Sequence, residues 1–204
     1  MAEREKRPAT YAELEAVPPH LVAEIIDGEL VTRHHGYVAP AMLRTMLAYS
    51  LRDARQTRSK PDASWQIVTL PELYLGSDIL VPELAAWSVD RLPFLSDEYV
   101  AIPPDWVCEL TSDDPACNPA LSSKVDLYRV AGVRFFWRVH LRPVLLEALK
   151  NEGSHWHEIG TWNSADIVCA PPFDAISFPL ADLWPLDKPL GFNEDPQALY
   201  AGDR

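Results

Sequence analysis

The stretch ILVPELAAW at residues 79–87, together with DWVCEL at residues 105–110, indicates the fold of this chain. Both runs are apolar and strand-like, and each contains one glutamate, Glu83 in the first and Glu109 in the second. A charged side chain is rarely buried unless it is paired or bound to a metal. The two runs therefore predict two core strands, each with a carboxylate that needs a cation.

Lys124 follows in a segment that predicts a helix over residues 118–131. Side chains one turn apart lie on the same side of a helix, so Lys124 shares its side with Leu121 and Tyr128. That places the lysine stem toward the protein, where an ammonium group needs a carboxylate or a phosphate.

These three charged residues predict a hard-metal site that handles phosphate. Alternation along a strand would put Glu83 on the same face as Val81 and Ala85, and neighbouring strands would bring Glu83 and Glu109 together at one end of the sheet. Mg²⁺ prefers carboxylate oxygens and open water positions. It polarises phosphoryl oxygens and activates bound water, which a lysine can orient. Taken singly, each residue also fits an ordinary solvated glutamate or lysine.

The rest of the chain predicts one domain of α/β (α+β) class, with a mixed β-sheet flanked by helices, over residues 10–185. A flexible tail is expected at 1–9, and an acidic, proline-containing tail at 186–204. The expected elements are a short helix capped by Thr10 and Glu13, a hairpin over 23–31 that turns at Asp27-Gly28, a helix over 39–55, strands over 66–70, 79–87, 105–111 and 133–139, and a meander over 144–149, 155–162 and 166–169.

The composition limits the functional classes. With 204 residues, 48% of them hydrophobic, the chain suits one globular domain. No stretch is apolar enough to span a bilayer, so no membrane partner is expected. Three cysteines with no close pair favour a reducing, cytoplasmic setting. The net charge of -12 argues against a broadly basic nucleic-acid surface, although residues 44–60 and 124–142 are locally basic.

Four histidines offer weaker candidates for a site. His155 and His157 would share a strand face as two zinc ligands could, but no third ligand is evident. His34 and His35 precede a helix and could contact phosphate, although they also fit ordinary loop residues.

The chain resembles the Uma2 family, within the PD-(D/E)XK nuclease-like superfamily, from residue 10 to residue 184. Besides the two apolar runs and Lys124, the resemblance rests on the order and spacing of several short segments. These are AEIIDGEL at 23–30, His34-His35, PELYLG at 71–76, Tyr128, Gly132-Val133, Trp137 and PFDAI at 172–176.

This resemblance implies a restriction-endonuclease-like fold and Mg²⁺-dependent cleavage of phosphodiester bonds in nucleic acid, with DNA as the expected substrate and Mn²⁺ as a substitute metal. Glu83 and Glu109 match the family's two metal carboxylates. Lys124 matches a lysine that has moved to the following helix, and Glu24 matches an acid on the N-terminal element. A homodimer is also expected.

Three positions depart from the family pattern. Glu83 stands where Asp is common, residues 111–115 read TSDDP where Ser-Pro-Ser-Thr is common, and Ala120 stands where an acid often precedes the lysine. A longer side chain at position 83 shifts the carboxylate by about one C–C bond, which matters in a metal shell. Two alternatives therefore stay open: a catalytically degenerate binding or assembly module, and a hydrolase for a small phosphate ester.

Overall fold

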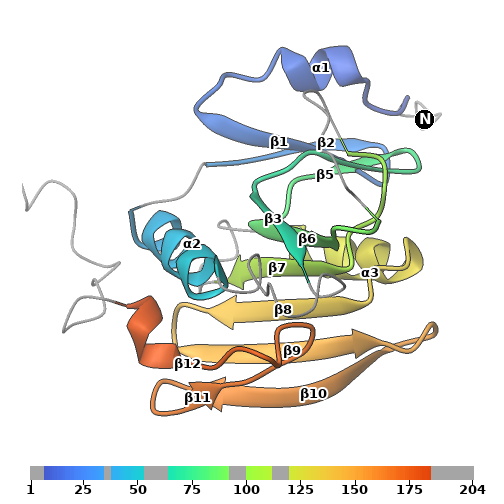
Figure 1. Cartoon of the computed structure of the whole chain (residues 1–204). Helices are drawn as coiled ribbons and strands as arrows, with labels where there is room; N and C mark the ends of the chain where they lie inside the picture. Colours follow the sequence, from blue (N-terminus) through green and yellow to red (C-terminus); the bar gives the residue numbers. More distant parts are fainter. Residues whose placement is uncertain (1–6, 35–37, 53–63, 92–99, 112–119, 185–204) are drawn as a thin grey trace, which may run out of the picture.

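The computed structural model describes residues 7–34, 38–52, 64–91, 100–111 and 120–184 (Figure 1). The predicted tails fall mostly outside these ranges, but residues 7–9 are described: Arg7 pairs with Glu13, and the Ala9 amide donates to the Gly28 carbonyl. The elements are α1 (Tyr11–Glu15), β1 (Leu21–Ile26), β2 (Glu29–His34), α2 (Val38–Ser50), β3 (Trp65–Thr69), β4 (Leu73–Leu75), β5 (Asp78–Leu80), β6 (Leu84–Ser88), β7 (Trp106–Thr111), α3 (Leu121–Val130), β8 (Phe135–His140), β9 (Leu145–Asn151), β10 (Trp156–Asn163), β11 (Ile167–Val168), β12 (Phe178–Pro179) and the 3-10 helix η4 (Leu180–Leu183).

Two sheets carry the fold, which confirms the predicted mixed α+β class. The large sheet has six strands in the order β10-β9-β8-β7-β6-β3; β7 and β8 run parallel, and the other neighbours run antiparallel. The small sheet has four antiparallel strands in the order β2-β1-β5-β4. In Figure 1 the small sheet, covered by α1, lies above the large one.

Each face of the large sheet packs against a different partner because successive side chains in a strand point to opposite faces. One face, with Trp106 and Trp137, packs against Leu43 and Leu47 of α2 and the C-terminal segment. The opposite face, with Trp87, packs against α3 and the small sheet. All three tryptophans are fully buried and belong to the core.

The N-terminal predictions hold in detail. Thr10 caps α1, and its backbone and side chain exchange hydrogen bonds with Glu13 in a complete capping box. The β1–β2 hairpin turns at Asp27 and Gly28, whose φ angles of 52° and 76° suit the Asp-Gly turn that connects twisted strands.

Two strand predictions are wrong. Residues 79–87 do not form one strand: β5 ends at Leu80 in the small sheet, and β6 begins at Leu84 in the large sheet. Pro82 lacks the amide hydrogen that a continuous ladder would need, so the chain crosses between the sheets here. Glu83 therefore lies in a connection, and the expected alternation with Val81 and Ala85 does not apply. Likewise, the strand at residues 166–169 does not extend the meander, because β11 pairs with β12 in a separate sheet.

The predicted helices are shorter in the described residues. The helix expected over 39–55 ends at Ser50, and residues 53–55 lie outside the described ranges. The helix expected over 118–131 is seen from Leu121 to Val130, while 118 and 119 lie outside them. No helix in the part of the chain that the structure describes has the length and apolar character needed to cross a membrane.

Candidate functional site

Six charged side chains meet between the two sheets, and we call them the charge cluster. They come from β1, β2, α2, the β5–β6 connection, β7 and α3. The members are Glu24, Arg33, Arg44, Glu83, Glu109 and Lys124. Residues up to 100 positions apart in the sequence, Glu24 and Lys124, thus converge in one buried cluster.

Lys124 lies at the centre of the cluster and is completely buried. Its Nζ is 2.7 Å from Glu109 Oε1, 2.8 Å from Glu24 Oε1 and 3.2 Å from the carbonyl oxygen of Val81. An ammonium group has three donors, so these three oxygens satisfy it. The Val81 amide also donates to Glu24 Oε1 at 2.6 Å, and this backbone contact fixes that carboxylate.

Glu83 is held by two arginines. Arg33 Nη1 lies 2.8 Å from Glu83 Oε1, and Arg44 Nη1 lies 2.7 Å from Glu83 Oε2. Arg33 also donates from Nη2 to the Val81 carbonyl at 3.1 Å and approaches Glu24 Oε2 with its Nε at 3.8 Å. Val81 therefore joins the two halves of the cluster through its main chain.

Burial and charge act against each other on the ionisable groups. Burial alone lowers the pKa of Lys124, but the attraction of Glu109 and Glu24 outweighs it and holds the pKa above its ordinary value. Burial also raises the pKa of Glu109, against the opposing pull of Lys124. The pKa of Arg33 is likewise raised by the surrounding carboxylates despite its burial. The ammonium of Lys124 therefore stays charged near neutral pH.

Tyr128 positions Glu109 from the next turn of α3. Its hydroxyl donates to Glu109 Oε1 at 2.8 Å, and the ring is fully buried. Burial, then the neighbouring carboxylates, raise the pKa of Tyr128 well above its ordinary value, so the phenol remains a donor. Glu109 Oε1 thus accepts from both Lys124 and Tyr128.

A family model described as "Putative restriction endonuclease", that of Uma2, matches residues 8–181. The chain belongs to the Uma2 family. Among solved structures, it is similar to a protein from Anabaena variabilis described as a putative nuclease belonging to DUF820. That likeness has a TM-score of 0.68 at 15% identity and covers 87% of this chain and 98% of the other, so it shows a shared fold. No curated protein matches the chain.

The structure of this Uma2 member brings all four sequence-predicted site residues into the charge cluster. Glu24 and Glu109 converge on Lys124, whereas Glu83 is linked to them through Arg33. Sequence analysis missed Arg33 and Arg44. The predicted hairpin contained a signal for Arg33: its register pairs Glu24 with Val31, which places Arg33 two residues along the same face.

A second polar group lies on the same face of the large sheet as Glu109. The His140 ring joins Thr111 Oγ1, 3.0 Å from Nδ1, to Glu147 Oε2, 2.9 Å from Nε2. Arg138 Nη1 lies 3.3 Å from the same Glu147 oxygen. Glu109 pairs with Arg138 and Thr111 with His140 in the parallel β7–β8 register, so this partly buried group borders the cluster. Sequence analysis missed it, because its residues are spread over three strands.

The donor chemistry of the cluster fits a hard divalent cation in part. Three carboxylates and the Val81 carbonyl supply the oxygen atoms that Mg²⁺ prefers. Within the described ranges, however, no three His, Cys, Asp or Glu side chains are grouped as a metal site would need. The protein's own cations lie between the carboxylates instead.

The zinc alternative gains no support: His157 is exposed, and His155 precedes β10 and approaches Glu152 at 3.7 Å. His34 is exposed, and His35 lies outside the described residues.

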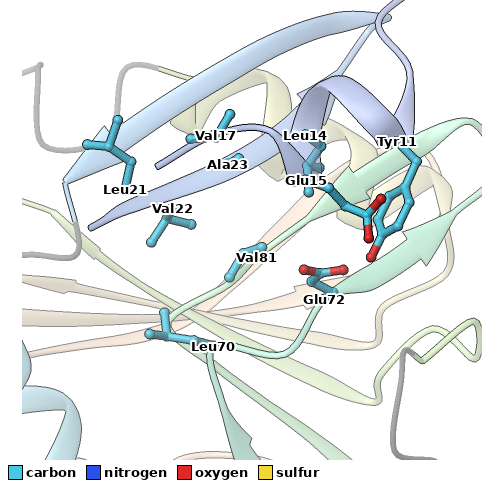
Figure 2. Close-up of a pocket in the computed structure, with 10 residues that line it drawn as sticks. All are labelled: Tyr11, Leu14, Glu15, Val17, Leu21, Val22, Ala23, Leu70, Glu72 and Val81. Carbon is cyan, nitrogen blue, oxygen red and sulfur yellow. The ribbon is translucent and has the colours of Figure 1, made fainter. Parts of the chain in front are cut away.

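A cavity of about 260 Å³ lies between α1, β1 and the segment before β4 (Figure 2). Val81 lines it with its side chain, while the Val81 main chain contacts the charge cluster. At the far side of the cavity, Tyr11, Glu15 and Glu72 point toward one another in Figure 2. Burial raises the pKa of Glu72, a hydrogen bond from Tyr11 opposes this, and Glu15 adds to it. The cavity shares Val81 with the cluster but is otherwise separate from it.

Proposed function

We propose that this chain is a Mg²⁺-dependent, endonuclease-like protein that hydrolyses phosphodiester bonds of nucleic acid at the charge cluster. The observation that carries the proposal is the fully buried Lys124, whose ammonium lies within 2.8 Å of both Glu24 and Glu109. Buried charges are costly, and groups with strongly shifted pKa values occur at functional sites more often than in ordinary cores. The family match and the nuclease-like fold point to the same chemistry.

In this proposal Glu83, Glu109 and Glu24 hold the metal. When bound, Mg²⁺ supplies charge stabilisation at the phosphoryl group and a more acidic bound water. Mn²⁺ would serve as a substitute, because it accepts the same oxygen ligands.

The protein's own groups then have separate tasks. Lys124 keeps its proton because its pKa is raised, so it acts as a donor that orients the attacking water and does not act as a base. Tyr128 is a positioning residue, since its hydroxyl fixes Glu109 Oε1. Glu24, anchored by the Val81 amide, keeps the ammonium in place.

A cleavage assay tests the proposal. Purified protein is incubated with plasmid DNA and Mg²⁺ or Mn²⁺, next to a Glu109→Ala/Lys124→Ala variant. The double change removes one carboxylate and one cation together, so it leaves no single unpaired charge at that ion pair. Arg129→Gln, at an exposed pair with Asp126 on the same helix, is the matched control. We expect the wild type and the Arg129→Gln control to cleave the plasmid and the double variant not to cleave it. A double variant that cleaves as fast as the wild type would refute catalysis at this cluster.

Specific observations favour two alternative functions. The two arginines on Glu83 favour a catalytically degenerate binding or assembly module, in which calorimetry would detect metal binding without cleavage of any nucleic acid. The net charge of -12 suits a small phosphate ester better than duplex DNA. Activity on a generic phosphodiester, but not on plasmid, would favour that second alternative.

The setting of the protein is also a proposal. Cys108 and Cys169 are free thiols, which suits a reducing cytoplasm. The outer strand β10 of the large sheet offers an edge for pairing with a second copy, as a homodimer would need. Size-exclusion chromatography with light scattering measures that state directly.

A further inference from the structure

The charge cluster is electrically balanced by its own side chains. Three carboxylates, on Glu24, Glu83 and Glu109, face three cations, on Lys124, Arg33 and Arg44. Every one of these residues except Arg44 is buried. In surroundings of low dielectric, a divalent cation added to a neutral cluster would leave two uncompensated positive charges. The departure of one resident cation would lower this excess from two charges to one, so metal entry is favoured when a resident cation leaves.

The three resident cations differ in how they are anchored. Lys124 contacts three oxygens and has no exposed surface. Arg33 contacts Glu83 with Nη1 and donates to the Val81 carbonyl with Nη2, while its Nε lies 3.8 Å from Glu24 without a hydrogen bond; its side chain is 4% exposed.

Arg44 is anchored less firmly. It reaches the cluster from α2 through one nitrogen, Nη1, which lies 2.7 Å from Glu83 Oε2. Its side chain, at 11% exposed, is the most accessible of the three cations. An arginine stem can turn toward solvent while its helix stays in place. Arg44 can therefore leave without breaking the contacts that join the two sheets.

We propose that Arg44 is the exchangeable cation of the cluster: a divalent metal ion gains Glu83 by displacing the Arg44 guanidinium, while Arg33 and Lys124 stay in place. This inference rests on the metal ligands of the proposed function. It makes Arg44 a positioning residue that holds the Glu83 carboxylate in the metal-free protein. It also predicts weak metal binding by the wild type, because each binding event must break an ion pair.

Calorimetric titration with MnCl₂ near neutral pH tests the exchange. Arg44→Gln removes the competing charge, so we expect Mn²⁺ to bind this variant roughly 10- to 100-fold more tightly than the wild type, as the loss of one charged hydrogen bond implies. Arg44→Met, which keeps the apolar stem, is the second variant in case the first does not fold. The midpoint of thermal unfolding, with and without Mn²⁺, reports the same gain independently.

Three controls isolate the charge and its partner. Arg44→Lys retains the positive charge and should bind Mn²⁺ within about threefold of the wild type. Arg52→Gln changes an exposed arginine that follows the same helix and stacks on Tyr49, so the affinity for Mn²⁺ should not change. Glu83→Gln/Arg44→Gln removes both partners, and the gain in affinity should disappear.

The outcomes separate this inference from the proposed function. Folded Arg44→Gln or Arg44→Met protein that binds Mn²⁺ no more tightly than the wild type overturns the exchange, and so does a gain that persists without Glu83. Absence of Mn²⁺ binding in every variant overturns it as well. Tighter binding without plasmid cleavage would support the exchange and refute the hydrolysis of nucleic acid at the cluster. Plasmid cleavage together with an unchanged Mn²⁺ affinity of the Arg44 variants would support the proposed function and overturn the exchange.

Discussion

The charge cluster and the ion pair between Arg7 and Glu13 of α1 both contain an arginine–glutamate contact, but in opposite surroundings. Arg44 and Glu83 lie 2.7 Å apart with side chains 11% and 8% exposed, whereas Arg7 and Glu13 lie 2.7 Å apart with side chains 70% and 42% exposed. Equal distances do not mean equal energies, because water screens the outer pair and not the inner one. The outer pair makes two hydrogen bonds where Arg44 makes one, so we expect burial to matter more than geometry for what each ion pair contributes to stability.

The largest expected difference comes from Lys124→Met. Removing the ammonium leaves the Glu24 and Glu109 carboxylates buried without their cation, so we expect a loss of about 3–5 kcal/mol in the free energy of unfolding. Arg7→Met should leave the urea midpoint unchanged, since Arg7 and its partner Glu13 are both exposed to water.

A second substitution tests whether the loss comes from the unpaired charge. Adding Glu109→Gln to Lys124→Met removes one uncompensated carboxylate, so the double variant should be more stable than Lys124→Met alone. A double variant that is less stable than either single one would contradict this account. Urea unfolding of all four proteins measures the cycle.

A smaller effect is expected from Tyr128→Phe. The substitution keeps the buried ring and removes the hydroxyl that donates to Glu109, so we expect a loss of about 1–3 kcal/mol. Tyr11→Phe, in the more exposed cavity beside Glu72, is the matched change and should cost less. Comparable losses for both would mean that the cluster is less protected from water than its burial indicates.

The charge cluster and the Arg7–Glu13 pair should also lose their contributions to stability at opposite ends of the pH scale. The folded-state pKa of Lys124 lies above 10.5, so the native protein holds its proton more firmly than the unfolded chain does. The stabilisation is therefore complete below pH 10.5 and is lost as pH rises through the folded pKa. We expect the free energy of unfolding to fall above pH 10.5 in the wild type, and less steeply in Lys124→Met, measured by urea unfolding from pH 9 upward. Tyr128 acts in the same direction.

The smallest predicted effect concerns Glu13. Hydrogen bonds from Arg7 and then from Thr10 lower its pKa from 4.5 to about 2, so its contribution is present above pH 4.5 and is lost as pH falls toward 2. Arg7→Ala should move this pKa back toward 4.5, and the two Thr10 hydrogen bonds should keep part of the shift. Titration followed by NMR of the Glu13 side chain measures both values. An unchanged pKa would show that the capping box alone is responsible.

Local patterns predicted the parts of the fold whose causes are local. The capping box at Thr10 and Glu13, the Asp27-Gly28 turn and the buried face of α3 all depend on residues within about one turn of each other. The break at residues 81–83 was missed because the apolar run continues through it. Pro82 was the available sign, since a proline inside a central strand argues against that strand.

The candidate site could be predicted in its acids and its lysine, but not in its arginines. Arg44 lies three residues before Leu47 on α2, next to the buried stripe, which is an unusual place for an arginine without a partner. Its pairing with Glu83 depends on how α2 packs against the end of the large sheet. A long-range placement of this kind has no local sequence signal, and the same is true of the His140–Glu147 contact between strands.

The position of Lys124 in the chain has a consequence for biosynthesis. A nascent polypeptide that has emerged only as far as Thr111 already contains Glu24, Glu83 and Glu109, but its two arginines neutralise only part of that charge. Because Lys124 on α3 supplies the cation that Glu24, Glu109 and the Val81 carbonyl contact, we expect the two sheets to dock at Val81 only after α3 has emerged from the ribosome. We therefore expect the first half of the protein to remain dependent on the second during synthesis, with the sheets docking late and together.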